Sequence, residues 1–380
     1  MSAAPAHLVH GMGMALAAPI WPAITASEAE KILAHFPAAG TPVAVQWHSP
    51  RPFSAAALVQ TERGAFLLKR HHRTVRTPDG LGDEHRLIAH LRTAGVSVPE
   101  IVTTHDGASA FVEGAWTYEL QRKAPGLDLY RDRPSWTPFL SHDHAHAAGM
   151  ALARLHLAAR GFDAPAREPQ PLVASFTIMP ASDPLAAAGN YVAARPALAA
   201  FLAGRPWRQE LARLFAAHGQ GLAERLSGSP SLWTHNDWHP SNLLWTQDGA
   251  VQTVFDFGLA TRTCALHDLA TAIERTAVDW LRLGEHGDRM SADPEAALAL
   301  LRGYHAILPL NAGEVETIAR LLPLVHVEFA LSEIDYFHGI VGDAGDAALA
   351  WDGYLVGHAE WFRSRSGRAF LDRLAHAELA

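Results

Sequence analysis

The spacing of hydrophobic and polar residues changes about a third of the way along the chain. Up to residue 121, apolar residues form short runs separated by turn residues, which is typical of strands joined by tight turns. These runs predict strands at Val43–His48, Ala56–Thr61, Ala65–Arg70, Ala110–Glu113 and Trp116–Gln121. After Arg122–Gly126, which breaks the pattern, most apolar residues follow the helical period instead.

Two helices are expected among these strands. A capping box at Thr25–Glu28 predicts a helix that runs to about Phe36, and the apolar stripe of Gly82–Arg92 predicts a second helix. Glu84 precedes the apolar residues of this second helix by three, four and seven positions, which places it on the buried face. Lys69 ends an apolar strand, where an unpaired ammonium would lose its hydration. We therefore expect Glu84 to be the partner of Lys69.

The second part of the chain is expected to be mainly helical. Helices are predicted at His142–Leu157 and Tyr191–Arg225, with a proline-rich loop at Pro165–Pro184. His156 lies on a helix that buries one face, so we interpret it as a core residue with hydrogen-bond partners.

A central stretch from Ser231 to Gly258 carries most of the candidate chemistry. Its apolar runs Asn242–Trp245 and Val251–Phe255 predict a hairpin that closes at Asp248-Gly249. That register places Asn242 opposite Phe255 and beside Asp256, at one end of the hairpin. An amide oxygen and a carboxylate together suit Mg²⁺, and Asp237 remains to face a hydroxyl group.

These residues form a spaced motif. His235-x-Asp237-x-x-x-x-Asn242 is followed by Asp256-Phe257-Gly258 and then by His267-Asp268-Leu269-Ala270. The arrangement resembles the protein-kinase-like fold, and its particular form resembles the aminoglycoside phosphotransferase and choline kinase family, homoserine-kinase-like members included.

The resemblance implies an α+β, two-lobed protein-kinase-like fold with a small antiparallel-sheet N-lobe and a larger, mostly helical C-lobe. The expected divisions are an N-terminal arm at 1–24, an N-lobe at 25–121, a hinge at 122–126 and a C-lobe at 127–380. The implied reaction moves the γ-phosphate of ATP to a hydroxyl of a small molecule, with Mg²⁺ as the metal.

The same resemblance assigns expected roles to individual residues. Asp237 is the catalytic residue that receives or orients the hydroxyl proton, and Asn242 and Asp256 are the metal ligands. The expected nucleotide-binding residues are Lys69, Glu84 and, through main-chain groups near the hinge, Gln121 and Lys123. His235 and Asp268 are expected to support the catalytic loop structurally.

The acceptor is expected to be a small molecule. Only Leu259–Leu266 separates the Asp256-Phe257-Gly258 motif from His267-Asp268, which leaves no room for the long activation segment of protein kinases. Asn236 also stands where regulated protein kinases carry an arginine. Both features disfavour a protein acceptor controlled by loop phosphorylation.

Charge and composition narrow the possible partners. The formal net charge is −8 and no basic run exists, which disfavours a nucleic-acid partner. No apolar run is long enough to span a membrane, Cys264 is the single cysteine, and no Lys or Arg precedes Lys31 as a signal peptide would require. We therefore expect a cytoplasmic protein; its oligomeric state is left open.

The C-terminal third is acidic and aromatic. Residues 261–380 hold 10 Arg and no Lys against 18 Asp plus Glu. The densest cluster of acidic and aromatic residues comprises Glu328, Glu333, Asp335 and Tyr336. Such groups favour a cationic acceptor, for example an amino alcohol or an aminoglycoside-like molecule. The resemblance implies that this helical region builds the acceptor pocket, so we assign these four residues to it.

Two alternatives remain open. His235, Asp237 and His239 alternate along the chain and could bind the metal of a metal-dependent hydrolase. A catalytically silent nucleotide-binding protein of the same fold would also carry these motifs. The sequence does not decide which hydroxyl is phosphorylated, whether ATP or GTP is the donor, or whether the role is metabolic or in antibiotic resistance.

Overall fold

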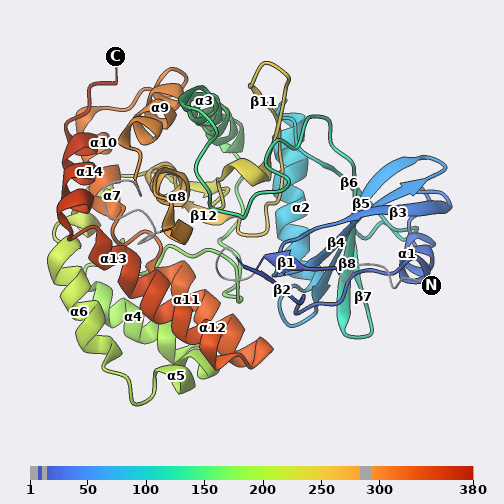
Figure 1. Cartoon of the computed structure of the whole chain (residues 1–380), viewed down its shortest axis with the longest axis horizontal. Coiled ribbons are helices and arrows are strands. Elements are labelled where there is room, and N and C mark those ends of the chain that lie inside the picture. The colour runs from blue at the N-terminus through green and yellow to red at the C-terminus, as the bar shows by residue number, and fades with distance from the viewer. Residues whose placement is uncertain (1–6, 11–14, 283–291, 380) are drawn as a thin grey trace. The chain divides into compact units, whose positions relative to one another are not determined.

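A computed structural model describes residues 7–10, 15–282 and 292–379. The chain divides into two units, the first formed by residues 1–126 with 253–255 and the second by residues 127–252 with 256–380. The first unit contains the large sheet and the second is mostly helical (Figure 1). The α+β composition agrees with the expected fold class.

The first unit is built on an antiparallel sheet with the strand order β3-β4-β5-β8-β6, and β7 also pairs with β8. Its described strands are β1 (Val9–His10), β2 (Leu16–Ala17), β3 (Pro42–His48), β4 (Ala55–Thr61), β5 (Gly64–His72), β6 (Glu100–Val102), β7 (Ala110–Glu113) and β8 (Trp116–Arg122). Its described helices are α1 (Ala26–Leu33) and α2 (Pro78–Thr93). The five predicted strands are confirmed to within two residues at each end.

The two faces of this sheet differ in character. Alternate residues of β5, including Phe66 and Leu68, join the hydrophobic core that α1 completes with Ile32 and Leu33. The residues between them point to the other face. There Lys69 is paired in register with Glu119 of β8.

Both predicted helices are present. The capping box at Thr25 and Glu28 is formed as expected and begins α1. Helix α2 begins at Pro78, four residues before the predicted start, because the Thr77 side chain accepts from the Gly80 N–H and Pro78 occupies the first turn.

The expected N-terminal arm includes residues 1–6 and 11–14, which lie outside the described residues. In the remainder of the arm, β1 pairs with β2, Val9 opposite Ala17 and His10 opposite Leu16.

The second unit holds most of the described helices. These are α3 (His142–Ala159), α4 (Pro184–Ala193), α5 (Pro196–Leu202), α6 (Trp207–His218), α7 (Leu222–Ser227), α8 (Ala265–Ala277), α9 (Pro294–His305), α10 (Ala312–Leu321), α11 (Val327–Tyr336), α12 (Ala344–Leu349), α13 (His358–Trp361) and α14 (Arg365–Ala375). Short helical turns are η1 (Pro240–Asn242), η2 (Trp280–Arg282), η3 (Phe337–Val341) and η4 (Ala350–Gly357). Its strands are β9 (Ser231–Thr234), β10 (Leu243–Trp245) and β12 (Thr261–Cys264), and β11 (Val251–Val254) begins in this unit and ends in the residues assigned to the first. None of the described helices has the length and apolar character needed to cross a membrane.

Helices α3 and α9 lie side by side in the core of this unit (Figure 1). They approach so closely that a Cβ added at Gly149 of α3 would lie 2.0 Å from the Leu300 carbonyl oxygen. A Cβ added at Gly303 of α9 would lie equally close to the carbonyl oxygen of His146. Only glycine permits this contact at both positions.

The stretch Tyr191–Arg225 is helical as predicted, but the structure divides it among four helices. Pro196 begins α5 and Pro206 precedes α6, and a proline in a helix interior removes a hydrogen bond and clashes with the preceding turn. The proline-rich loop before α4 is confirmed.

Candidate active site

Asp268, in the first turn of α8, holds the loop that follows β9. Its two carboxylate oxygens accept hydrogen bonds from the backbone N–H groups of His235 (2.9 Å) and Asn236 (2.8 Å). His156 donates to the same carboxylate through Nε2 at 3.0 Å, and its Nδ1 lies 2.9 Å from the Tyr304 hydroxyl. Burial raises the pKa of Asp268, but these hydrogen bonds and the charges of His156 and His235 outweigh it, so that the net pKa is lowered.

The loop turns sharply at Asn236. This residue has φ = 59°, a left-handed conformation that asparagine tolerates better than most residues. Its side-chain oxygen accepts hydrogen bonds from Thr234 (3.0 Å) and Thr263 (3.2 Å), which belong to the paired strands β9 and β12. Asp237 follows Asn236 directly, so the paired strands β9 and β12 fix the backbone position from which the Asp237 side chain extends.

Asp237 and Asn242 are in direct contact. The Asn242 Nδ2 donates to the backbone oxygen of Asp237 at 2.9 Å and to its Oδ2 at 3.0 Å. Because the amide NH₂ of Asn242 faces Asp237, its oxygen points away from that carboxylate. The amide oxygen is therefore the atom that Asn242 can offer to a cation.

The other oxygen of Asp237 lies among cationic and imidazole groups. Oδ1 forms an ion pair with Nη1 of Arg275, a fully buried side chain of α8, and lies 3.5 Å from Nε2 of His239. The Asp237 side chain remains 15% exposed, so one edge of the carboxylate reaches the surface of the unit. Arg275 was not predicted from the sequence, because it stands between Glu274 and Thr276 and nothing in this local pattern indicates that it is buried.

Asp256 stands on a strained turn beside this loop. It has φ = 61°, which is uncommon for a residue other than glycine. The ring of Phe257 is buried and packs 4.8 Å from the ring of His235. Arg167 donates to the carbonyl oxygens of Gly258 (3.0 Å) and Ala260 (3.2 Å). These contacts hold the Asp256 turn against the segment that carries Asp237.

The hairpin register differs from the prediction by one residue. The predicted partner of Thr246 was Val251, whereas its N–H donates to the Ala250 carbonyl at 2.9 Å. The connection is a three-residue loop ending at Gly249, whose φ of 82° permits the extra residue. Asn242 correspondingly belongs to the helical turn η1 and not to the strand, which begins at Leu243.

Lys69, in the first unit, lies in a buried polar cluster. Its Nζ is 3.9 Å from Oε1 of Glu119. The same oxygen accepts a hydrogen bond from His71 (3.0 Å), and Oε2 of Glu119 accepts from His85 (3.0 Å) and Gln121 (2.9 Å). Burial raises the pKa of Glu119, but Lys69 and the two histidines outweigh it and hold the pKa well below its usual range. Sequence analysis missed Glu119, although it stands among apolar residues in a predicted strand.

Glu84 belongs to the same cluster, since its carboxylate lies within 4.8 Å of the ligand atoms of His85 and Glu119. Glu84 is 1% exposed, in agreement with its expected position on the buried face of α2. Its pairing with Lys69 stays a prediction.

Gln121 and Lys123, the expected nucleotide-binding residues near the hinge, both form hydrogen bonds within the first unit. The Gln121 side chain is buried and donates to Glu119, while the Lys123 N–H donates to the Ala65 carbonyl at 2.9 Å. That N–H is therefore already occupied, so a main-chain contact of Lys123 with a nucleotide would have to use its carbonyl oxygen.

The four residues of the expected acceptor pocket have other surroundings. Glu328 accepts hydrogen bonds from Ser175, Thr177 and Ile178, at distances from 2.6 to 3.0 Å, and so anchors the loop before α4. Asp335 accepts from the Leu198 N–H at 3.2 Å, in the first turn of α5. Glu333 and Tyr336 are fully buried. These contacts give Glu328 and Asp335 a structural role, and the assignment of the four residues to the acceptor pocket stays a prediction.

The arrangement of a metal-dependent hydrolase is not formed. Among the described residues, two groups of three His, Cys, Asp or Glu side chains have ligand atoms close enough to bind one metal ion, and neither contains His235, Asp237 or His239. His235 uses Nδ1 to accept from the Asp237 N–H at 3.2 Å, and the Nδ1 of His239 lies 2.9 Å from the Ser241 hydroxyl.

Comparison with known proteins supports the resemblance to kinases that the sequence motif indicates. The family described as the phosphotransferase enzyme family matches residues 52–316. A homoserine kinase of Cupriavidus metallidurans is 27% identical over 259 residues, covering 66% of this chain and 69% of the relative. A homoserine kinase of Xanthobacter autotrophicus is 28% identical over 279 residues, covering 73% of this chain and 75% of the relative.

Solved structures share the fold. A microcompartment-associated aminopropanol kinase has a TM-score of 0.56 at 21% identity, covering 90% of this chain and 99% of that one. The amicoumacin kinase hAmiN, solved with AMP-PNP, Ca²⁺ and Ami, has a TM-score of 0.56 at 15% identity, covering 93% of this chain and 96% of that one. The expected kinase-like fold is confirmed.

Proposed function

The chain belongs to the phosphotransferase enzyme family and is a kinase of small-molecule hydroxyl groups, and we propose that Asp237 receives the proton of the acceptor hydroxyl. In this step the acceptor oxygen bonds to the γ-phosphorus of ATP, the bond from that phosphorus to ADP breaks, and the hydroxyl proton passes to Asp237. The observation that carries the proposal is the contact of Asn242 Nδ2 with the Asp237 carboxylate at 3.0 Å. It places the proposed base beside a proposed metal ligand.

Asn242 and Asp256 would hold the Mg²⁺ ion, which would neutralise phosphate charge during transfer. The donor set fits such an ion, because the Asn242 NH₂ is turned toward Asp237 and leaves its amide oxygen as the ligand. A carboxylate and an amide oxygen are hard ligands of the kind Mg²⁺ prefers. The strained turn at Asp256 supports this role, since such conformations gather at functional sites.

Lys69 is the proposed ligand of the ATP phosphates. Glu119 lies 3.9 Å from the ammonium in a buried cluster, and Glu84 is proposed to help hold the ammonium in position. Gln121 and the Lys123 carbonyl are proposed to lie near the adenine edge. His235 and Asp268 are proposed to act only by fixing the catalytic loop.

For the acceptor, we propose an amino alcohol that also carries a carboxylate, with homoserine as the first candidate. The curated relatives named above are homoserine kinases. Arg275, buried against Asp237, is the cation that such a carboxylate would meet. A planar guanidinium binds carboxylates through two parallel hydrogen bonds, which suits this recognition.

The decisive experiment measures ADP release with a panel of acceptors: homoserine, 1-amino-2-propanol, choline, sugars and aminoglycosides. We expect Asp237→Asn to bind AMP-PNP as the wild type does and to lose about 10²- to 10⁴-fold in kcat, the usual contribution of a positioned base. Asp248→Asn, in the exposed turn of the β10–β11 hairpin, is the matched control and should retain full activity.

Two outcomes would overturn the proposal. Full turnover by Asp237→Asn would remove Asp237 from the chemistry. Binding of AMP-PNP by the wild type, without ADP release for any acceptor, would favour the catalytically silent alternative.

A further inference from the structure

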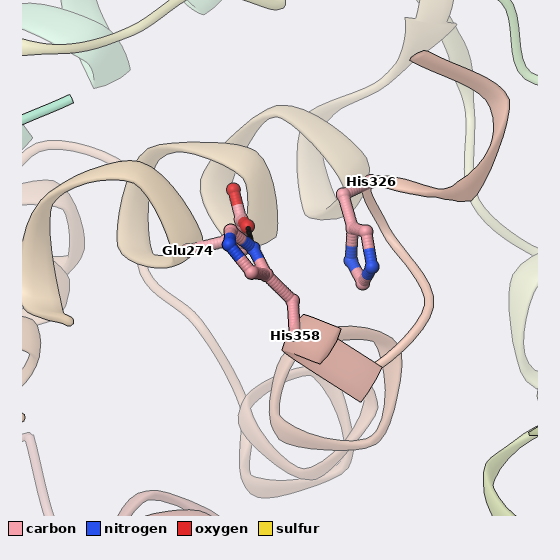
Figure 2. A group of neighbouring side chains, drawn as sticks. All are labelled: Glu274, His326 and His358. Atoms are coloured by element: carbon pink, nitrogen blue, oxygen red, sulfur yellow. Dashed lines mark hydrogen bonds and ion pairs between the residues drawn. The ribbon is translucent and has the colours of Figure 1, made fainter. Parts of the chain in front are cut away.

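Three segments that are distant in the sequence bring a carboxylate and two imidazoles together inside the second unit. Glu274 comes from α8, His326 immediately precedes α11, and His358 begins α13 (Figure 2). One ligand atom of each residue lies within 4.8 Å of the others. The three residues are 1%, 2% and 8% exposed, so the group belongs to the core and not to the surface.

The hydrogen bonds of the group orient its nitrogen atoms. Nε2 of His326 donates to the Leu355 carbonyl at 3.0 Å, which leaves Nδ1 as the nitrogen with a lone pair. No described residue forms a hydrogen bond with that Nδ1. A backbone carbonyl that fixes one ring nitrogen while the other stays available is the usual support of a metal-binding histidine.

His358 is held with equal definition. Its Nδ1 lies 2.7 Å from Oε1 of Glu274, the contact drawn as a dashed line in Figure 2. Its ring stacks on Trp280 with centroids 3.6 Å apart and planes 12° from parallel. The rings of His326 and His358 are 5.3 Å apart. Packing therefore fixes both imidazoles before any ligand arrives.

The space beside the group suits an ion and not an organic molecule. A cavity of about 10 Å³ is lined by Glu274 and His326, together with Arg275, Phe329 and Tyr354. That volume is near the roughly 10 Å³ minimum for a single water molecule. An amino alcohol or a sugar does not fit in it.

A further carboxylate near the group also lacks a hydrogen-bond donor. Glu333 is fully buried, and no described residue donates a hydrogen bond to either of its oxygens. Buried polar groups in proteins are nearly always bonded, so the unbonded Nδ1 of His326 points to a missing partner that binds its lone pair.

We propose that Glu274, His326 and His358 bind one Zn²⁺ ion, with a water molecule in the cavity as the fourth ligand. Two imidazoles and one carboxylate are a donor set that zinc accepts, whereas Mg²⁺ prefers oxygen alone. On binding, the ion replaces the proton shared by His358 and Glu274, and that proton leaves to the solvent. The ion would connect α8, the start of α11 and α13, and its ligand Glu274 is the residue before Arg275. Binding of the ion does not depend on the proposed phosphotransfer.

A comparable group of three residues in the first unit is less suited to a metal ion. Glu84, His85 and Glu119 also lie within 4.8 Å of one another, but the Lys69 ammonium is 3.9 Å from Glu119 and already supplies a positive partner to that carboxylate. Hydrogen bonds from His71 and Gln121 also occupy the Glu119 oxygens. The proposal therefore concerns the group in the second unit alone.

The experiment is a metal count on the full chain, expressed in zinc-supplemented medium and freed of nucleotide and Mg²⁺. We expect about one Zn²⁺ per chain, as for a site of three protein ligands and one water molecule. His326→Gln and His358→Gln should lose it. His144→Gln, a half-buried histidine of the same unit, and Asp256→Asn should both retain it, which separates this site from the proposed phosphotransfer metal.

Zinc-free wild-type protein, also after refolding with zinc, would overturn the proposal, as would full zinc content in both histidine variants. X-ray absorption of the wild-type zinc protein keeps the test valid if those variants do not fold. We expect imidazole and oxygen ligands at about 2.0–2.1 Å, and a sulfur ligand at about 2.3 Å would assign the metal to Cys264 instead.

Discussion

Glu119 in the first unit and Glu333 in the second are both fully buried, yet their pKa values move in opposite directions. Burial acts on both carboxyls in the same sense and raises the pKa. At Glu119, Lys69 and the histidine hydrogen bonds outweigh burial, whereas burial prevails at Glu333 and raises its pKa to about 8 despite the charge of Arg275. The difference shows that partners, and not depth, decide whether a buried carboxyl is charged.

Glu119 and Glu333 also differ in their hydrogen bonds. Both oxygens of Glu119 accept hydrogen bonds, and this arrangement is suited to holding Lys69 in place. The region around Glu333 contains unsatisfied buried atoms next to the proposed catalytic Asp237 and the proposed zinc site. Regions of the second kind are where ligands are expected to complete the structure.

Removing the charge of Glu119 should have the largest effect on stability. Glu119→Gln removes a buried counter-charge of Lys69, and breaking a buried pair in this way costs about 3–5 kcal/mol. We expect this loss in the free energy of unfolding from urea denaturation, together with a higher KM for ATP. Glu100→Gln, at a half-exposed glutamate of the same sheet, should change the free energy by less than about 0.5 kcal/mol. Equal losses in the two variants would contradict the comparison.

A substitution at Arg275 tests whether the region around Glu333 recognises a carboxylate on the acceptor. Arg275→Lys keeps the charge but loses the planar, two-bond geometry, so a carboxylate-bearing acceptor should bind more weakly. We expect the KM for homoserine to rise by about 10- to 100-fold, corresponding to the roughly 1.5–3 kcal/mol of hydrogen bonds to charged groups. The KM for 1-amino-2-propanol should not change. The exposed Arg320→Lys serves as the control, and an equal rise for both acceptors would exclude recognition of a carboxylate by Arg275.

The smallest effect is expected from the pH dependence at Glu333. Because its pKa is raised to about 8, the native state keeps a proton that the unfolded state releases. The free energy of unfolding should therefore fall as the pH rises from about 4.5 to about 8. Glu333→Gln lacks this loss, so relative to the wild type it should gain more than about 1.4 kcal/mol between about pH 5 and pH 9 in metal-free protein.

Glu328→Gln provides the matched control on the same helix. Since Ser175, Thr177 and Ile178 all donate to Glu328, this substitution should destabilise the protein at every pH tested. A pH profile of Glu333→Gln that runs parallel to the wild type would show that Glu333 is charged in the native protein.

Elements that depend on neighbouring residues could be predicted well. The capping box of α1 and the strands around Lys69 follow from local patterns, and each is present. The contact of Asp237 with Asn242 spans five residues, so the motif alone brings the two side chains together. The hairpin register failed by one residue because the choice between a two-residue and a three-residue loop depends on the conformation of Gly249.

Residues whose partners are distant in the sequence could not be predicted. Glu119 meets Lys69 only because β8 pairs with β5, and Arg275 meets Asp237 only because α8 packs behind the catalytic loop. The acidic residues of α11 were assigned to an acceptor pocket from charge, aromatic neighbours and the family resemblance, and these gave no indication that Glu328 and Asp335 hold a loop and a helix end.

The sequence by itself determined the family, the order of the elements and the local motif of Asp237, Asn242 and Asp256, because each depends on spacing along the chain. Only the tertiary structure decided which buried charges are neutralised and which are left for a ligand. Coulombic attraction and desolvation depend on distances in space, and those distances are set by the packing of strands and helices that lie far apart in the sequence.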